Sequence, residues 1–330
     1  MSADYLVIGS NSFSGASFID HLLTRGREVI GVSRSEEVAL PHRPYGWGGK
    51  PGRFAFHRID LNTDLDTLDR ILADARPPVI VNFAAQSMVA ESWQNPDHWM
   101  MTNVVSAVRL HERLRHLDYL ERYVHVTTPE VYGSTGGWVK EGHPFNPSTP
   151  YAVSRAAGDM SLASYFKAYG FPVVSTRAAN VYGPGQQLYR IIPRTVLFAL
   201  TGQTLQLHGG GHSARSFIHI DDVSSATRAI AEHGEPGGTY HISTNDQISI
   251  RDVVARVLAR LGMTFDDCVE ITGERLGKDQ SYMLDSSKLR NELGWSDTIG
   301  IEAGIDSTVK WVKTHLDELK ALPQHYQHKP

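Results

Sequence analysis

The first 25 residues constrain the fold most, because a short apolar run, a glycine-containing loop and an amphipathic segment follow one another directly. Residues 5–8 (Tyr-Leu-Val-Ile) are typical of a strand, residues 9–15 (Gly-Ser-Asn-Ser-Phe-Ser-Gly) of a loop, and the segment after them of a helix. In such a unit Gly9 permits the tight turn, Gly15 permits close packing of the helix, and N–H groups at the helix N-terminus can bind a pyrophosphate. We therefore predict a dinucleotide site, although Ser12 stands where the usual pattern has its middle glycine.

Strand and helix patterns alternate through the first 180 residues, which predicts a parallel sheet with helices on both faces. After residue 180 the periods become irregular, and glycine-rich turns separate short segments. We predict an α/β fold, a Rossmann-type doubly wound parallel sheet with a smaller mixed α/β region. We expect residues 1–180 mainly to form the NAD(P)-binding domain and residues 181–330 mainly to form the substrate-binding region, with some segments interleaved. Strand patterns occupy 28–32, 54–59, 79–82, 123–127 and 173–176, and helical patterns occupy 65–75, 97–116, 151–169, 250–261, 286–293 and 302–319.

The end of the second predicted strand bears on the choice of cofactor. Residues 33–35 (Ser-Arg-Ser) include no acid, whereas an Asp or Glu there would hydrogen-bond the ribose 2′-hydroxyl of NAD and an arginine suits a 2′-phosphate. Arg34 therefore favours NADP, with NAD as the other choice, and an interpretation of Arg34 as a solvated loop charge has equal weight. Asp60 ends the third predicted strand and could approach the adenine. The predicted cofactor contacts are Gly9, Ser12, Phe13, Gly15, Arg34, Asp60, Leu61, Ala84 and Ala85.

A second group of functional residues follows the predicted strand at 123–127. The hydroxyl of Thr128 and the carboxylate of Glu130 come where a strand's carboxyl end would present them to the ligand crevice of an open α/β sheet. Tyr151 opens a helical pattern, and Arg155 lies on the same helix face, so its guanidinium can favour the phenolate. An isolated Tyr-x-x-x-Arg spacing is usually an ordinary surface pair. Beside Thr128 and Glu130, we interpret it as an active site with tyrosine as the base.

Composition and charge narrow the classes of function. The 330 residues are 41% hydrophobic and 21% charged with a net charge of −4, so there is no general basic field for nucleic acid. No apolar run approaches the roughly 20 residues that span a bilayer, and the N-terminus lacks signal-peptide features, so we expect a soluble cytoplasmic protein. The single cysteine, Cys268, and the scattered histidines indicate neither a disulfide framework nor a metal site.

Together these residues resemble the extended short-chain dehydrogenase/reductase family, and within it the nucleotide-sugar 4,6-dehydratases and 4-epimerases. Residues 9–15 occupy the place of the family's G-x-x-G-x-x-G, Thr128 that of its Ser/Thr, and Tyr151 that of the tyrosine in Y-x-x-x-K. Residues 130–133 (Glu-Val-Tyr-Gly) are similar to the E-V-Y-G of the dehydratases. Segments 31–34 and 85–92 resemble GDP-mannose 4,6-dehydratase, and segments 180–184, 215–222, 274–279 and 292–295 resemble dTDP-glucose 4,6-dehydratase.

The resemblance implies a reaction through a transient ketone. Tyr151 would take the proton of the sugar 4-hydroxyl while the C4 hydride passes to NADP⁺ or NAD⁺, and Thr128 would hold the 4-oxygen. Glu130 would then remove the C5 proton, the 6-hydroxyl would leave as water, and the hydride would return to C6. The product would be a nucleotide-linked 4-keto-6-deoxyhexose. Arg155 would lower the pKa of the tyrosine and orient the cofactor.

Two departures from the family pattern leave alternatives open. Arg155 replaces the family's lysine, and Pro129 replaces an aspartate that many dehydratases place before the glutamate. A 4-epimerase, a 5,6-dehydratase and a nucleotide-binding protein that has lost the chemistry are therefore alternatives to a 4,6-dehydratase. For the enzyme alternatives the expected partner is a nucleotide-diphosphate sugar substrate, with expected contacts from Ser87, Asn180, Arg215 and Arg275.

We also expect a homodimer. Family members pair the helices that correspond to residues 97–116 and 151–169 into a four-helix interface. The apolar residues expected in this interface are Val104, Val108, Leu162 and Phe166.

Overall fold

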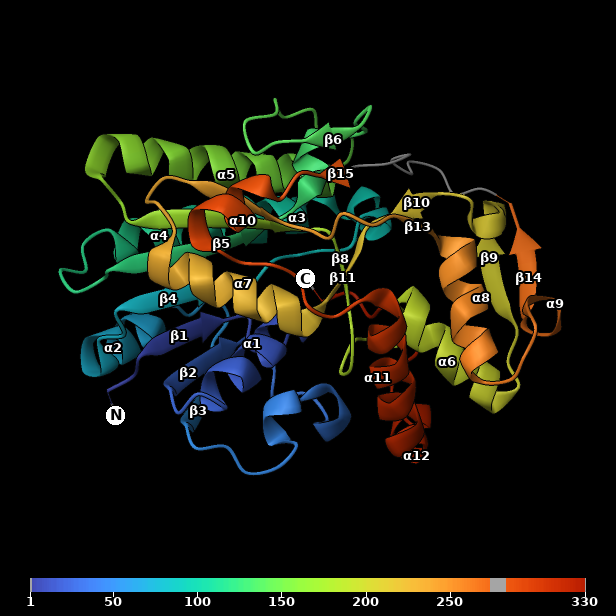
Figure 1. The fold of residues 1–330 in the computed structure, drawn as a ribbon. Coiled ribbons are helices and arrows are strands. Elements are labelled where there is room, and N and C mark those ends of the chain that lie inside the picture. The colour runs from blue at the N-terminus through green and yellow to red at the C-terminus, as the bar shows by residue number, and fades with distance from the viewer. Residues whose placement is uncertain (1, 274–282, 330) are drawn as a thin grey trace.

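The computed structural model describes residues 2–273 and 283–329. Its centre is a seven-stranded parallel sheet with the order β12-β7-β5-β4-β1-β2-β3 (Figure 1). The order reverses beside β1, where ligands usually bind in such sheets, and this arrangement confirms the predicted Rossmann-type fold. The strands are β1 (Tyr5–Ile8), β2 (Glu28–Ser33), β3 (Arg53–Arg58), β4 (Val79–Asn82), β5 (Arg122–Thr127), β7 (Val173–Ala178) and β12 (Thr239–Ile242).

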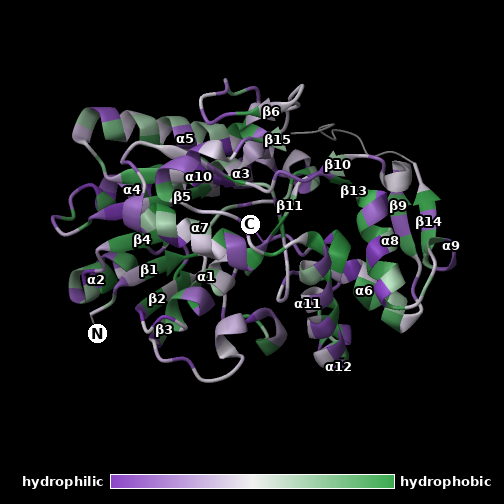
Figure 2. Cartoon of the chain, viewed as in Figure 1, coloured by the Kyte–Doolittle hydropathy of each residue, from purple (hydrophilic) through white to green (hydrophobic). Residues whose placement is uncertain are grey.

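Helices cover both faces of the sheet because each strand sends alternate apolar side chains to opposite sides. In β1, Leu6 and Ile8 pack into one layer, and Tyr5 and Val7 pack into the other. The strands are therefore buried on both faces, and Figure 2 colours β1 and β4 mostly hydrophobic. The first layer contains α2 (Leu65–Ala75), α4 (Ala107–Leu114) and α5 (Pro150–Tyr169), and the second contains α1 (Phe13–Leu23) and α7 (Ile220–His233).

The helix that leads into α4 has an irregular middle. α3 (Pro96–Met100) continues into a π-helical segment, Met101–Ser106, and then into α4. Such π-helical turns are frequent at functional sites. Here the segment carries Asn103, whose side chain accepts from the backbone N–H of Gln86 at 2.9 Å and donates to the carbonyl of Gln86 at 3.0 Å. The irregular turn therefore fixes the loop that follows β4.

A second region lies at the carboxyl edge of the sheet and has its own apolar core between three helices and short strand pairs. The helices are α6 (Ile191–Thr201), α8 (Ile250–Arg260) and α11 (Ile301–Thr314), followed by α12 (Leu316–Lys320), with α9 (Phe265–Cys268) beside them. The strand pairs are β8 (Asn180–Tyr182) with β11 (Phe217–His219), β9 (Leu205–His208) with β14 (Val269–Thr272), and β10 (Ala214–Arg215) with β13 (Ile248–Ser249).

The two regions exchange chain segments. β12 pairs with β7, and α7 and α10 (Ser287–Leu293) pack on the sheet, although all three follow residue 180. A further pair, β6 (Trp138–Val139) with β15 (Met283–Leu284), joins an early segment to a late one. Within residues 2–273 and 283–329, no helix combines the length and the apolar character that a membrane span requires.

Candidate active site

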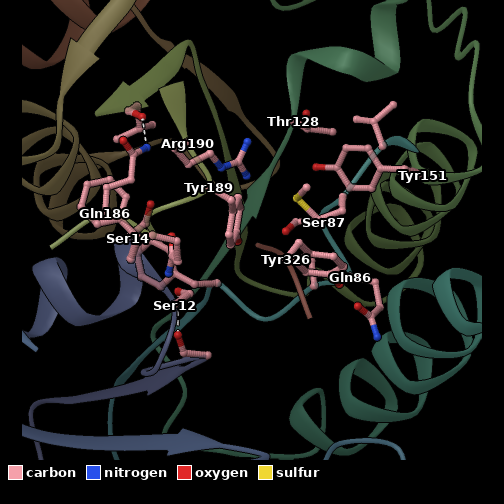
Figure 3. Close-up of a pocket in the computed structure, with 18 of the residues that line it drawn as sticks. Ser12, Ser14, Gln86, Ser87, Thr128, Tyr151, Gln186, Tyr189, Arg190 and Tyr326 are labelled. Carbon is pink, nitrogen blue, oxygen red and sulfur yellow. Dashed lines mark hydrogen bonds between the residues drawn. The ribbon is translucent and has the colours of Figure 1, made fainter. Parts of the chain in front are cut away.

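A cavity of about 1110 Å³ lies where the carboxyl ends of β1, β2, β4 and β5 meet the second region. Figure 3 shows Ser12 and Ser14 toward one end, Thr128 and Tyr151 toward the other, and Tyr189 between them. Clefts at this edge of an open α/β sheet are the usual place for a nucleotide ligand.

The loop after β1 has the shape that a dinucleotide requires. Gly9 has a φ of +80°, and a Cβ there would lie 2.6 Å from the backbone nitrogen of Ala84. A Cβ on Gly15 would lie 2.3 Å from the carbonyl oxygen of Gly9, so this glycine serves close packing. Ser12 caps α1, since its Oγ accepts from the N–H of Gly15 at 3.0 Å and donates to Gly9 at 2.7 Å. The serine in place of the middle glycine thus closes the loop and leaves its narrow shape intact.

The other expected cofactor contacts also lie around this cavity. The end of β2 lines it with Ser33, Arg34 and Ser35. Asp60 Oδ1 accepts from the N–H of Asn62 at 2.9 Å, so this carboxylate stabilises its own turn. Together with the glycine loop and the N-terminus of α1, these groups fit a dinucleotide. The cavity is lined by Gly9, Ser12, Phe13, Arg34, Asp60, Leu61, Ala84 and Ala85.

Thr128 and Glu130 lie on a short 3-10 turn directly after β5. Thr128 is the N-cap of this turn, Pro129–Tyr132, and its Oγ1 accepts from the N–H of Glu130 at 3.3 Å. Pro129 takes the first position, where a backbone N–H has no partner within the turn, so proline fits there without loss. The departure at residue 129 therefore leaves Glu130 in place on the cavity wall.

Tyr151 comes from the first turn of α5. Thr149 caps this helix by accepting from the N–H of Ala152 at 3.1 Å. Tyr151 is 8% exposed, and its phenol hydrogen-bonds the side chain of Thr128 and lies within electrostatic range of Glu130. A hydroxyl, a carboxylate and a phenol therefore meet on one wall, which we call the catalytic wall.

The protonation of Tyr151 depends on two opposing effects. Burial raises the pKa of Tyr151, and it outweighs the positive charge of Arg155, which lowers that pKa. Arg155 is itself buried, and its guanidinium donates to the carbonyl oxygen of Val126. Arg155 therefore lies behind the cavity wall and acts on the phenol through its charge, while the phenol stays protonated in the ligand-free protein at neutral pH.

A buried ionic network supports the catalytic wall from behind. Asp159 accepts from Arg177 at 2.7 Å and from Thr127 at 3.1 Å, and His125 Nε2 lies 3.3 Å from its other oxygen. Arg177 also donates, at 2.7 Å, to the hydroxyl of Tyr132, which ends the turn that carries Glu130. Burial alone would raise the pKa of Asp159, but His125 and the charge of Arg177 lower it to about 2. The network joins β5, β7, α5 and the turn.

Three of the four expected substrate contacts, Ser87, Asn180 and Arg215, also line the cavity. Arg275 lies outside the described residues. Arg190 was not expected, yet it lines the cavity, and its charge is one of the groups that lower the pKa of Tyr151 against the effect of burial. The available signal was a pair of arginines, four residues apart, at the start of an otherwise apolar helix. The lining residues missed by sequence reasoning include Gln86, Gln186, Tyr189, Arg190, Arg194 and Tyr326.

Comparison with known proteins agrees with this geometry. The family model described as GDP-mannose 4,6 dehydratase matches residues 6–308. The chain belongs to this family. Its membership confirms the resemblance to extended short-chain dehydrogenase/reductase enzymes that act on nucleotide sugars.

Relatives of this GDP-mannose 4,6 dehydratase family member match nearly the whole chain. A dTDP-glucose 4,6-dehydratase of Xanthomonas campestris pv. campestris is 31% identical over 333 residues, which cover 95% of this chain and 94% of the relative. The crystal structure of a dTDP-glucose 4,6-dehydratase from Streptomyces venezuelae with NAD bound is 31% identical, has a TM-score of 0.87, and covers 95% and 98% of the two chains. A UDP-glucose 4-epimerase of Thermus thermophilus, in complex with NAD, is 27% identical with a TM-score of 0.83 and covers 94% and 98%.

Proposed function

We propose that this family member is an NAD(P)-dependent nucleotide-sugar 4,6-dehydratase, which converts a nucleoside-diphosphate hexose to the 4-keto-6-deoxyhexose. The observation that carries the proposal is the meeting of Thr128, Glu130 and Tyr151 on one wall of a cavity suited to a dinucleotide. The similarity to dTDP-glucose 4,6-dehydratases over nearly the whole chain supports the same class of reaction.

Each residue of the catalytic wall has a defined role. Thr128 holds the sugar 4-oxygen by a hydrogen bond, and Tyr151 takes the proton of the 4-hydroxyl as C4 is oxidised. The ketone makes the C5 proton acidic, and Glu130 removes it as the 6-hydroxyl leaves as water. NAD(P)⁺, when bound, would accept the hydride from C4 and return it to C6. Because burial keeps the phenol neutral, the charges of Arg155 and Arg190 are needed to favour the phenolate.

The two ligands occupy different parts of the cavity. The glycine loop and the N-terminus of α1 hold the cofactor pyrophosphate. The end of β2 presents Arg34 between two serines, which supports a preference for NADP, whereas the solved relatives contain NAD. Arg190, Arg194 and Arg215 supply charge-assisted donors for the diphosphate of the substrate.

The reaction is tested by incubating the protein with dTDP-, UDP- and GDP-linked hexoses and measuring the product mass. A 4,6-dehydratase gives a product lighter by one water molecule with no net consumption of cofactor. Glu130→Gln keeps the shape but removes the base, so reduced cofactor and a 4-keto sugar should accumulate. Tyr151→Phe is the matched control and should leave the cofactor oxidised. Each variant should lose at least ~10²-fold in turnover.

The same experiment separates the alternatives. A 4-epimerase needs no carboxylate at residue 130, so it would give an unchanged mass and an active Glu130→Gln variant. A 5,6-dehydratase would lose water and leave an alkene in place of the ketone. An unchanged mass with every sugar, together with intact cofactor binding, would identify a nucleotide-binding protein without the chemistry.

We further propose a homodimer through α5 and the neighbouring helix at residues 96–114. The helices contact each other, and both expose apolar side chains. The residues expected in the dimer interface are not the exposed ones. Leu162 and Phe166 pack into the core, and Val104 and Val108 are half-buried. The exposed apolar residues of these helices are Met101, Val105, Val153, Met160 and Tyr169.

Met160→Lys tests the dimer. Met160 is 64% exposed, so a lysine there harms the monomer little but places a charge in an apolar interface. The wild-type protein should sediment as a dimer at micromolar concentration and Met160→Lys as a monomer. Ile271→Lys is the matched control, because Ile271 is 58% exposed on β14 in the second region. A monomeric wild-type protein would contradict the proposal.

A further inference from the structure

The segment after α12 returns to the cavity. Residues 323–329, which we call the C-terminal tail, run beside the ends of the sheet strands, and Figure 1 draws the end of the chain near the centre of the molecule. Figure 3 shows Tyr326 inside the cavity beside Ser87 and Gln86. The tail residues that line the cavity are Pro323, His325, Tyr326, Gln327 and Lys329.

The main chain of the tail accepts hydrogen bonds from two side chains beside β1, where the strand order of the sheet reverses. The carbonyl oxygen of Lys329 accepts from Gln86 Nε2 at 2.6 Å and from Arg34 at 3.0 Å. Arg34 follows β2 and Gln86 follows β4, the two strands that flank β1. The tail therefore bridges the crevice in which a dinucleotide lies in sheets of this order. Its carbonyl is an acceptor on Arg34 of the kind that a cofactor phosphate or hydroxyl would supply.

Aromatic contacts anchor the same segment. The ring of His328 stacks on Trp99 with centroids 5.0 Å apart and planes at 8°, and on His98 at 5.1 Å and 10°. His98 Nδ1 lies 2.8 Å from His328 Nε2, a hydrogen bond that requires one ring to donate and the other to accept. Tyr326 packs edge-on against Tyr189 at 5.8 Å. Defined side-chain contacts therefore position the tail.

We propose that the C-terminal tail is an intramolecular competitor of the dinucleotide: the docked tail occupies part of the cofactor site, and it must leave before the cofactor binds. The inference rests on the proposed function, because it takes this crevice as the cofactor site. A lid would close over a bound cofactor and leave Arg34 and Gln86 to that ligand, whereas this tail takes hydrogen bonds from both. A tethered segment has a high local concentration, so even weak contacts compete.

Removal of the tail is the direct test. A chain that stops after Leu322 retains the residue that packs on the core of the second region and loses residues 323–330. The apparent affinity for a ligand falls in proportion to the undocked fraction, so the shortened chain should bind NAD and NADP about three- to tenfold more tightly in calorimetry. A synthetic peptide of residues 323–330, added to the shortened chain, should raise the apparent Kd without changing the number of sites.

Two single substitutions form a matched pair in the full chain. His328→Ala removes the ring that stacks on His98 and Trp99, so this variant should bind the cofactor as tightly as the shortened chain. Lys320→Gln changes an exposed side chain on α12, outside the tail and the cavity, so it should bind like the wild type. Thermal unfolding of both variants verifies that the fold is unchanged.

The outcomes separate this proposal from the proposed function. Weaker binding after removal of residues 323–330 would show a lid, and equal binding would show a passive tail; either result would overturn the competitor proposal alone. Absence of dinucleotide binding by both the full and the shortened chain would overturn the cofactor site and the competitor proposal together.

Discussion

The two walls of the cavity are stabilised in opposite ways. Behind the catalytic wall, the side chains of Asp159 and Arg177 are 5% and 3% exposed, and Arg177 donates both to Asp159 and to the hydroxyl of Tyr132 at the end of the turn that carries Glu130. The facing wall, which the second region contributes, presents exposed or half-exposed arginines such as Arg190 and Arg215, and the C-terminal tail enters the cavity from the same region. One wall is held by a buried ion pair, and the other presents charged side chains that solvent can reach.

This difference separates chemistry from recognition. Breaking one partner of a buried ion pair leaves an uncompensated charge, so the catalytic wall keeps a single arrangement. Exposed groups lose little when they exchange a protein partner for water or ligand. The facing wall can therefore release the tail and accept a nucleotide, while Thr128, Glu130 and Tyr151 stay in place.

Asp159→Asn should have the largest effect, because it breaks the support of the catalytic wall. It leaves Arg177 buried without its carboxylate, which costs about 3–5 kcal/mol of unfolding free energy in denaturant titrations. Asp317→Asn, which alters an exposed pair with Lys320, should cause no measurable change.

The same carboxylate predicts acid sensitivity. Because its folded pKa of about 2 lies below the ordinary value of 3.8, its contribution is complete above 3.8 and is lost as the pH falls toward 2. Asp159→Asn should remove this part of the pH dependence. Equal stability of Asp159→Asn and the wild type would show that the catalytic wall does not depend on the network.

Arg34→Ala tests whether an exposed charge of the cavity recognises the cofactor. In the chain that stops after Leu322, so that the tail does not contribute, the substitution should weaken NADP relative to NAD by ~10–100-fold. Only NADP loses a charge-assisted contact, worth about 1.5–3 kcal/mol. Arg53→Ala, which alters an exposed pair with Glu28, is the control in the same titrations. Equal losses for both cofactors would show that Arg34 does not bind the 2′-phosphate.

A fall in pH should release the tail from the cavity, and we expect its effect on cofactor affinity to be the smallest of the predicted effects. Burial and the charges of His98 and Arg34 lower the pKa of His328, and Glu91 opposes them. Docking is therefore complete above the ordinary histidine pKa of about 6.5 and weakens as the pH falls below it. The ratio of the NAD affinities of the shortened and full chains should therefore fall by a few-fold as the pH is lowered from roughly 7.5 to 5.5. A constant ratio would show that His328 does not control docking.

Local patterns were sufficient for much of the fold and of the site. The apolar run at 5–8 and the helical pattern at 65–75 match β1 and α2 residue for residue. Thr128 and Tyr151 could be placed because strand ends and helix starts of a parallel sheet converge at one edge. Arg190 and Tyr189 could not, because they lie directly before α6, whose position depends on the packing of the second region and not on the sheet.

The sequence by itself determined the parallel sheet, the glycine loop and the three groups of the catalytic wall, since each depends on residues close in the chain and on the hydrophobic period. Only the tertiary structure decided that burial outweighs Arg155 at Tyr151, that Leu162 belongs to the core, and that Lys329 meets Arg34 and Gln86. These outcomes depend on contacts between residues far apart in sequence and on the solvent that packing excludes, and neither leaves a local pattern.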